Sequence, residues 1–137
     1  MGAIVPSGKG EIYMMNVSVI KHWSPLLLWV ALIFTGSSLP GQQIPDPVSQ
    51  ASVALHIFEY TVLYFTALRA FSSVSGINHK HLVVTAIVFC VLYSMSDEIH
   101  QVFVPGRRAD GWDVVADTLG IVVGVISVYW WKRVKLV

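Results

Sequence analysis

Long apolar runs separated by short polar connections constrain the fold of this chain more than any other feature. Four of them lie at residues 22–39, 48–70, 81–99 and 112–131. Each is close to the ~20 residues that a helix needs to cross the hydrocarbon core of a bilayer. The whole chain is 55% hydrophobic and only 12% charged, which is too apolar for an ordinary soluble domain of 137 residues. The sequence therefore predicts an all-α fold, an integral membrane bundle of four transmembrane helices.

The four runs leave little chain outside the membrane, so we expect one small domain. The prediction is an N-terminal cytoplasmic segment at 1–21, a four-helix membrane domain at 22–131 and a basic cytoplasmic tail at 132–137. The first run is similar to a secretory signal, but we expect it to be retained as a helix. The single cysteine, Cys90, excludes an intramolecular disulfide and is expected to be a small buried residue. A net charge of +1 without a basic face argues against nucleic acid as a partner.

Lysine and arginine near the ends of the runs predict the orientation in the membrane. By the positive-inside rule, both termini and the second connection lie in the cytoplasm, and the first and third connections lie outside. The first connection, "PGQQIPDP", contains neither residue type. The third connection takes Arg107 and Arg108 to the outer side, so a function other than orientation is expected for them. The basic residues that support this orientation are Lys9, Lys21, Arg69, Lys80, Lys132, Arg133 and Lys135.

The ionisable residues within the runs gather in the outer half of the predicted bundle. Counted from Val48, the second helix reaches His56 after ~12 Å and Glu59 after ~16 Å at the usual helical rise. The third helix ends on the outer side and the fourth begins there. Their outer turns contain Asp97, Glu98, His100, Gln101, Asp113 and Asp117. These residues are therefore expected to form one site.

Helical spacing assigns these residues to shared faces, because residues three or four apart are neighbours on a helix. The predicted stripes are Ser52, His56, Glu59 and Leu63, then Asp97, His100 and Gln101, then Asp113, Asp117, Gly120 and Gly124. The last stripe ends in "GIVVG", a spacing of small residues that lets another helix backbone approach closely. Before it, Pro105-Gly106 predicts a turn, and Asp110 is well placed to cap the fourth helix.

The cost of burying charge indicates what this cluster is for. A charge at the centre of a spanning helix costs ~3 kcal/mol, so intramembrane acids need protonation, pairing or water. Arg107 and Arg108 are candidate partners for Glu59, Asp97, Glu98 and Asp117, and a purely structural salt-bridge cluster is one interpretation. More acids and histidines converge than two arginines can neutralise. This excess favours an outward-facing, partly hydrated polar cavity.

Two segments closely resemble the motifs of the VanZ-like family of membrane proteins. One is "SDEIHQVFVPGRRADGWDVVADTLGIVVG" at residues 96–124, and the other is "HIFEY" at residues 56–60. The exit from the first run, "GSSLPG", is also similar to the family pattern. The resemblance covers all four runs. One departure is "ASVAL" before the histidine, where many members have an Asp-Lys pair, so a role that needs a cation there is in doubt.

The resemblance implies which residues form the ligand-binding site and where the protein resides. The family takes its name from a protein associated with low-level resistance to teicoplanin, a lipidated glycopeptide antibiotic that acts at the cell envelope. It implies a multi-pass plasma-membrane protein and supplies no reaction. Carried over position by position, the family's polar residues correspond to His56, Glu59, Tyr60, Asp97, Glu98, Gln101, Arg107, Asp113 and Asp117.

Two functions remain open on these residues. The first is binding of a membrane lipid, a lipid-linked cell-wall precursor or the antibiotic, with Arg107 pairing with a phosphate or carboxylate. The second is an enzyme acting on a lipid or lipid-linked phosphate, with His56 or His100 as base and Arg107 stabilising phosphoryl charge. Ion movement is disfavoured because apolar residues close the inner half. We expect no cofactor and no metal, since "HIFEY" and "DEIHQ" are not established metal-ligand motifs.

Overall fold

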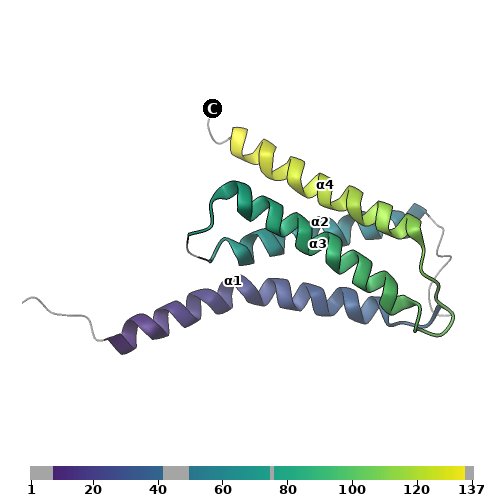
Figure 1. The fold of residues 1–137 in the computed structure, drawn as a ribbon, viewed down its shortest axis with the longest axis horizontal. Coiled ribbons are helices and arrows are strands. Elements are labelled where there is room, and N and C mark those ends of the chain that lie inside the picture. Colours follow the sequence, from purple (N-terminus) through teal and green to yellow (C-terminus); the bar gives the residue numbers. More distant parts are fainter. Residues whose placement is uncertain (1–7, 42–49, 75, 135–137) are drawn as a thin grey trace, which may run out of the picture.

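The computed structural model confirms an all-α chain with four helices (Figure 1). It describes the backbone of residues 8–41, 50–74 and 76–134, and the side chains of residues 19–41, 52–74 and 76–131. No strand occurs within those ranges. The helices are α1 (Gly8–Ser37), α2 (Gln50–Phe71), α3 (His79–Gln101) and α4 (Gly111–Val134).

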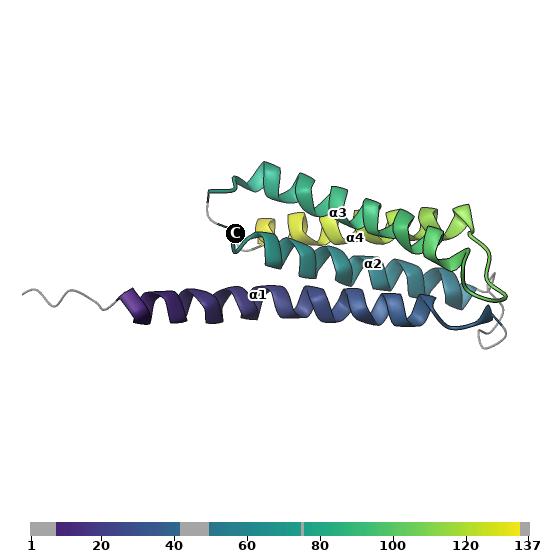
Figure 2. The same cartoon turned by 60° about the horizontal axis from the view of Figure 1, so that its bottom comes forward.

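Successive helices run in opposite directions and lie side by side (Figures 1 and 2). The end of α1 and the start of α2 therefore lie at the same end of the bundle as the α3–α4 connection. The Gly41 backbone N–H donates to the Pro105 carbonyl oxygen over 3.1 Å and ties these segments together. We call this end, where residues 38–41 meet residues 102–110, the site end. The start of α1 and the end of α4 lie at the opposite end, as the predicted orientation requires.

Three helices contain stretches that are long and apolar enough to cross a membrane: Val19–Ser37, His79–Gln101 and Gly111–Trp131. The remaining helix, α2, has 22 residues and is about 33 Å long, which also suffices. Its described part carries His56, Glu59 and Arg69, which lower its hydropathy. Because α2 packs against all three other helices, His56 and Glu59 are partly covered by protein, whereas Arg69 in the last turn of α2 is exposed.

The interior of the bundle is built from small and aromatic side chains of α2 and α3. Tyr60, Leu63, Tyr64, Ala86 and Cys90 are all buried, which confirms the expectation for the cysteine. Large apolar side chains instead cover the outside, as expected for a surface that meets lipid tails. The most exposed of these outside the helix ends include Leu27, Leu28, Leu92 and Ile99.

The small-residue spacing on α4 lets its backbone approach α2 closely. A Cβ atom at Gly120 would lie 2.5 Å from the Ile57 carbonyl oxygen, so only glycine fits there without a shift. Thr61 Oγ1 donates to the Gly120 carbonyl oxygen over 2.9 Å at the same crossing. One turn further, Gly124 lies against the Tyr64 ring. The close approach predicted from "GIVVG" is confirmed, and it presses the acidic face of α4 against α2.

Some predictions concern residues outside the described ranges. These are the first connection at 42–49 and the side chains of Lys9, Lys132, Arg133 and Lys135. Helix α1 begins at Gly8, so the segment predicted as an N-terminal extension to residue 21 is helical from that point. The domain boundaries at residues 21 and 131, and the side of the membrane on which each end lies, stay predictions.

Candidate functional site

The turn between α3 and α4 forms the rim of the site and is fixed by two local devices. Gly106 has a φ of 76°, a left-handed conformation that favours glycine and reverses the chain after Pro105. Asp110 Oδ1 accepts a hydrogen bond from the Trp112 backbone N–H over 2.9 Å and caps the start of α4. The Asp110 backbone N–H donates to Glu98 Oε2 over 2.8 Å, which attaches the turn to α3. The turn and the cap predicted for this segment are both confirmed.

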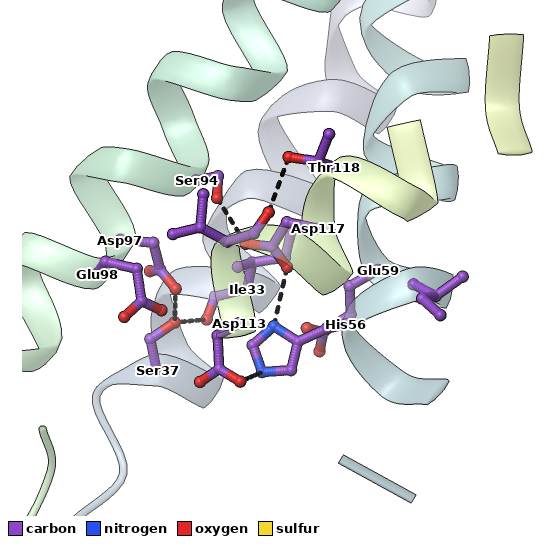
Figure 3. Close-up of polar contacts among 12 residues, drawn as sticks. Ile33, Ser37, His56, Glu59, Ser94, Asp97, Glu98, Asp113, Asp117 and Thr118 are labelled. Atoms are coloured by element: carbon purple, nitrogen blue, oxygen red, sulfur yellow. Dashed lines mark hydrogen bonds and ion pairs between the residues drawn. The ribbon is translucent and has the colours of Figure 1, made fainter. Parts of the chain in front are cut away.

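A histidine between two carboxylates joins α2, α3 and α4 (Figure 3). His56 Nδ1 donates to Asp117 Oδ1 over 2.9 Å, and His56 Nε2 lies 3.7 Å from Asp113 Oδ1. The second oxygen of Asp117 accepts a hydrogen bond from Ser94 Oγ over 2.6 Å. Asp117 is only 2% exposed, so these bonds replace the water that the carboxylate loses on burial.

A second carboxylate, Asp97, connects α3 to α1. Its Oδ2 atom accepts from Ser37 Oγ over 2.7 Å and from Gln101 Nε2 over 3.2 Å. All three side chains are buried. Asp97 Oδ1 is also buried and has no hydrogen-bond partner among the described residues. This oxygen can therefore accept a hydrogen bond from a ligand or from water.

Glu59 and Tyr60 lie between these two groups. Glu59 interacts electrostatically with His56, Asp117, Asp97 and Arg107, so it is close to both carboxylate groups and to the rim. Tyr60 is 1% exposed, and its buried hydroxyl lies near Ser94 without a hydrogen bond of good geometry to any described side chain. Polar side chains from α2, α3 and α4 thus converge at the site end, as the sequence predicted, and Ser37 adds a contribution from α1 that it did not predict.

Among the residues that the structure describes, Arg107 and Arg108 do not form the direct salt bridges to the acids for which the sequence made them candidates. Within the described side chains, His56 lies 3.7 Å from Asp113 and 2.9 Å from Asp117, contacts that are ion pairs only when its ring is protonated, and neither arginine makes an ion pair. Arg108 is exposed. Arg107 is half-buried and interacts at longer range with Glu59 and Asp113, and its Nε atom is buried with no hydrogen-bond partner in the described part of the chain. The Arg107 guanidinium consequently retains capacity for an anionic group from outside.

A groove of about 430 Å³ opens between the starts of α2 and α4, next to this network. Apolar side chains form most of its lining, and its polar members are at the site end. Asp113 belongs to both the groove and the network, because it also faces His56. The lining residues are Val53, Asp110, Trp112, Asp113, Val115, Ala116 and Leu119.

The sequence model of the VanZ/LLP1 family matches residues 22–132. The chain belongs to the VanZ/LLP1 family. The matched range contains every residue of the network described above and confirms the resemblance seen in the sequence motifs. Comparison with curated proteins and with solved structures gave no match.

In this VanZ/LLP1 protein the predicted site residues lie in one cluster, with the exception of His100. His100 stacks on Phe34 with ring centroids 4.5 Å apart, and its Nε2 atom lies 3.0 Å from Ser38 Oγ, so it faces α1 rather than the His56 network. The residues that the structure brings together are His56, Glu59, Tyr60, Asp97, Glu98, Gln101, Arg107, Asp113 and Asp117.

Sequence reasoning missed Ser37 and Ser94, which supply hydroxyl donors to the two most important carboxylates. A signal for Ser94 existed, because it lies three residues before Asp97 on α3. Ser37 lies in "GSSLPG", which was noted only as a family-like exit from the first run. No group of three or more His, Cys, Asp or Glu residues in the described ranges is arranged to hold a metal ion.

Proposed function

We propose that this VanZ/LLP1 protein is a plasma-membrane protein of the cell envelope that binds a polar headgroup at its site end. Both termini would lie in the cytoplasm and the site end outside, following the distribution of lysine and arginine. The ligand would be a membrane lipid or a lipid-linked envelope precursor. The observation that carries the proposal is the cluster of carboxylates from α2, α3 and α4, in which Asp97, Glu98 and Asp117 are buried and Glu59 is half-buried. It contains more acids than helix attachment needs.

The side chains divide the recognition of such a headgroup between them. Arg107 would pair with a phosphate or carboxylate, because guanidinium donors match these groups in a bidentate manner. Asp97, Asp113 and Gln101 would bind hydroxyl, amide or amine groups. A lipoglycopeptide carries the same combination of hydrocarbon chain and polar groups. A role in glycopeptide antibiotic resistance is therefore included in the proposal, with the origin of the family name as its support.

Thermal unfolding of the purified protein in detergent, with increasing phosphatidylglycerol, tests the headgroup role. Loss of a hydrogen bond to a charged group costs about 1.5–3 kcal/mol, so Arg107→Ala should weaken binding by roughly 10- to 100-fold. Arg108→Ala is the matched control, because Arg108 is the exposed neighbour, and it should bind within a factor of about two of the parent. Equal affinity of Arg107→Ala and the parent contradicts the role of Arg107.

The geometry of His56 favours one second candidate, an enzyme acting on a lipid or lipid-linked phosphate. Asp117 holds Nδ1, which leaves Nε2 directed toward Asp113 on the groove lining. A histidine oriented in this way by a carboxylate can act as a general base at its other nitrogen. Incubation with lipid extracts followed by mass spectrometry should then reveal a converted product that His56→Ala no longer forms and His100→Ala still forms. Absence of product with the parent protein rejects this candidate.

A further inference from the structure

The groove between α2 and α4 has the shape and polarity of a site for an amphiphile. From Trp112 to Leu119 it extends about 10 Å along α4. Its volume of about 430 Å³ lies within the range of small-molecule sites. Val53, Val115 and Leu119 on its walls are also exposed on the outside of the bundle, so a hydrocarbon chain can enter from the lipid without passing through the helices.

The charge at the polar end of the groove is negative. Asp110 and Asp113 line it, and none of the described lining residues is a lysine, arginine or histidine. The contacts described above use one oxygen of each carboxylate: Asp110 Oδ1 accepts a hydrogen bond from the Trp112 N–H, and Asp113 Oδ1 lies 3.7 Å from His56 Nε2. The other oxygen of each can accept further hydrogen bonds. A cation with several N–H donors complements this arrangement better than any anion.

Trp112 also favours a cation in the groove. It lies between Asp110 and Asp113 in the sequence, and its side chain lines the groove and is 76% exposed. The face of an indole ring attracts cations, and tryptophan prefers the level of the headgroups in a membrane. An ammonium group held near two carboxylates and an indole is therefore favoured by the side chains of Asp110, Asp113 and Trp112.

We propose that the headgroup bound at this site carries a primary ammonium, held by Asp110 and Asp113 beside Trp112, with the hydrocarbon chain in the α2–α4 groove. This inference rests on the proposed headgroup-binding function and narrows its ligand. A phosphate of the same headgroup would face Arg107, which interacts electrostatically with Asp113 and is therefore near it. The ligand is a zwitterionic lipid of the phosphoethanolamine type.

Native mass spectrometry of the purified protein with three lipids of equal chain length tests the inference. Phosphatidylethanolamine, phosphatidylcholine and phosphatidylglycerol all present a phosphate, but only the first also has ammonium N–H donors. We expect phosphatidylethanolamine to bind about tenfold more tightly than either of the others, equivalent to about 1.4 kcal/mol. Equal binding of phosphatidylethanolamine and phosphatidylcholine overturns the assignment of a primary ammonium.

Two variants locate the effect at the groove. Asp110→Asn retains an acceptor for the Trp112 N–H and removes the charge, so it should reduce the preference for phosphatidylethanolamine at least threefold while the helix cap persists. Leu119→Trp fills the groove and should weaken all three lipids. Leu92→Trp, at an exposed apolar position of α3, is the matched control and should leave them unchanged. If Asp110→Asn retains the preference for phosphatidylethanolamine, or if Leu119→Trp still binds the lipids like the parent, the lipid does not bind in the α2–α4 groove.

The outcomes separate this inference from the proposed function. Binding of all three lipids that depends on Arg107 but shows no ammonium preference leaves headgroup binding in place and rejects only the inference. Failure of every lipid to bind, with the parent protein folded, rejects both.

Discussion

Removal of Asp117 should destabilise the bundle strongly, because this carboxylate joins three helices. It accepts bonds from Ser94 Oγ at 2.6 Å and from His56 Nδ1 at 2.9 Å while only 2% exposed. Hydrogen bonds to charged groups contribute about 1.5–3 kcal/mol, and interhelical bonds in membranes reach at most about 1.7. We take ~1.5 kcal/mol for each of the two bonds. Asp117→Ala should therefore lower the free energy of unfolding by about 3 kcal/mol.

A double-mutant cycle of His56→Ala and Asp117→Ala isolates the bond between these two residues. Unfolding of the four proteins in mixed micelles with increasing dodecyl sulfate gives the free energies, and the coupling should be about 1.5 kcal/mol. Thr118→Ala is the control, since Thr118 is exposed and its hydroxyl donates, among the described residues, to the Val114 carbonyl oxygen of its own helix. A coupling below about 0.5 kcal/mol would refute the reasoning, because neighbours in one hydrogen-bond network couple more strongly than that.

Two further predictions concern the close helix crossing and the orientation in the membrane. Gly120→Ala places a Cβ atom against the Ile57 carbonyl oxygen and should lower the free energy of unfolding by about 1–3 kcal/mol in the same assay. Gly36→Ala is the control and should leave the free energy of unfolding unchanged, because an added Cβ atom there meets nothing within 4 Å. Equal effects of the two would contradict the crossing. A membrane-impermeant maleimide should label Arg108→Cys in intact cells and Lys80→Cys only after permeabilisation, with buried Cys90 unlabelled in the parent protein. The reverse pattern would invert the proposed orientation.

The sequence predicted the helices and the gathering of polar residues because both depend on one-dimensional features. Apolar runs near 20 residues long set the spans, and short connections force antiparallel neighbours. The acidic residues on α2, α3 and α4 then fall toward one end whatever the details of packing. The small residues on α4 likewise predicted a close crossing, although the partner, α2 at Ile57, came from the structure.

The pairing within the site could not be predicted, because it depends on how each helix is rotated about its axis. Asp97 and His100 both contact α1, but the roughly 60° between positions three residues apart buries Asp97 against Ser37 and leaves His100 half-buried against Phe34. A serine in the sequence is a weak signal of a site residue, because its hydroxyl can donate either within its own helix or to another helix. Ser127 Oγ, for example, donates to the Val123 carbonyl oxygen of its own helix, whereas Ser94 Oγ donates across to Asp117.

The central claim, that a lipid headgroup occupies the polar cluster at the site end, is tested most directly by photo-crosslinking. A phosphatidylethanolamine with a diazirine in its headgroup is incubated with the purified protein, irradiated, and the labelled residues are mapped by mass spectrometry. We predict labels on residues 56–60 and 97–117, which unlabelled phosphatidylethanolamine competes away. Labels spread over lipid-facing residues such as Leu28 and Leu92, without competition, would contradict the claim.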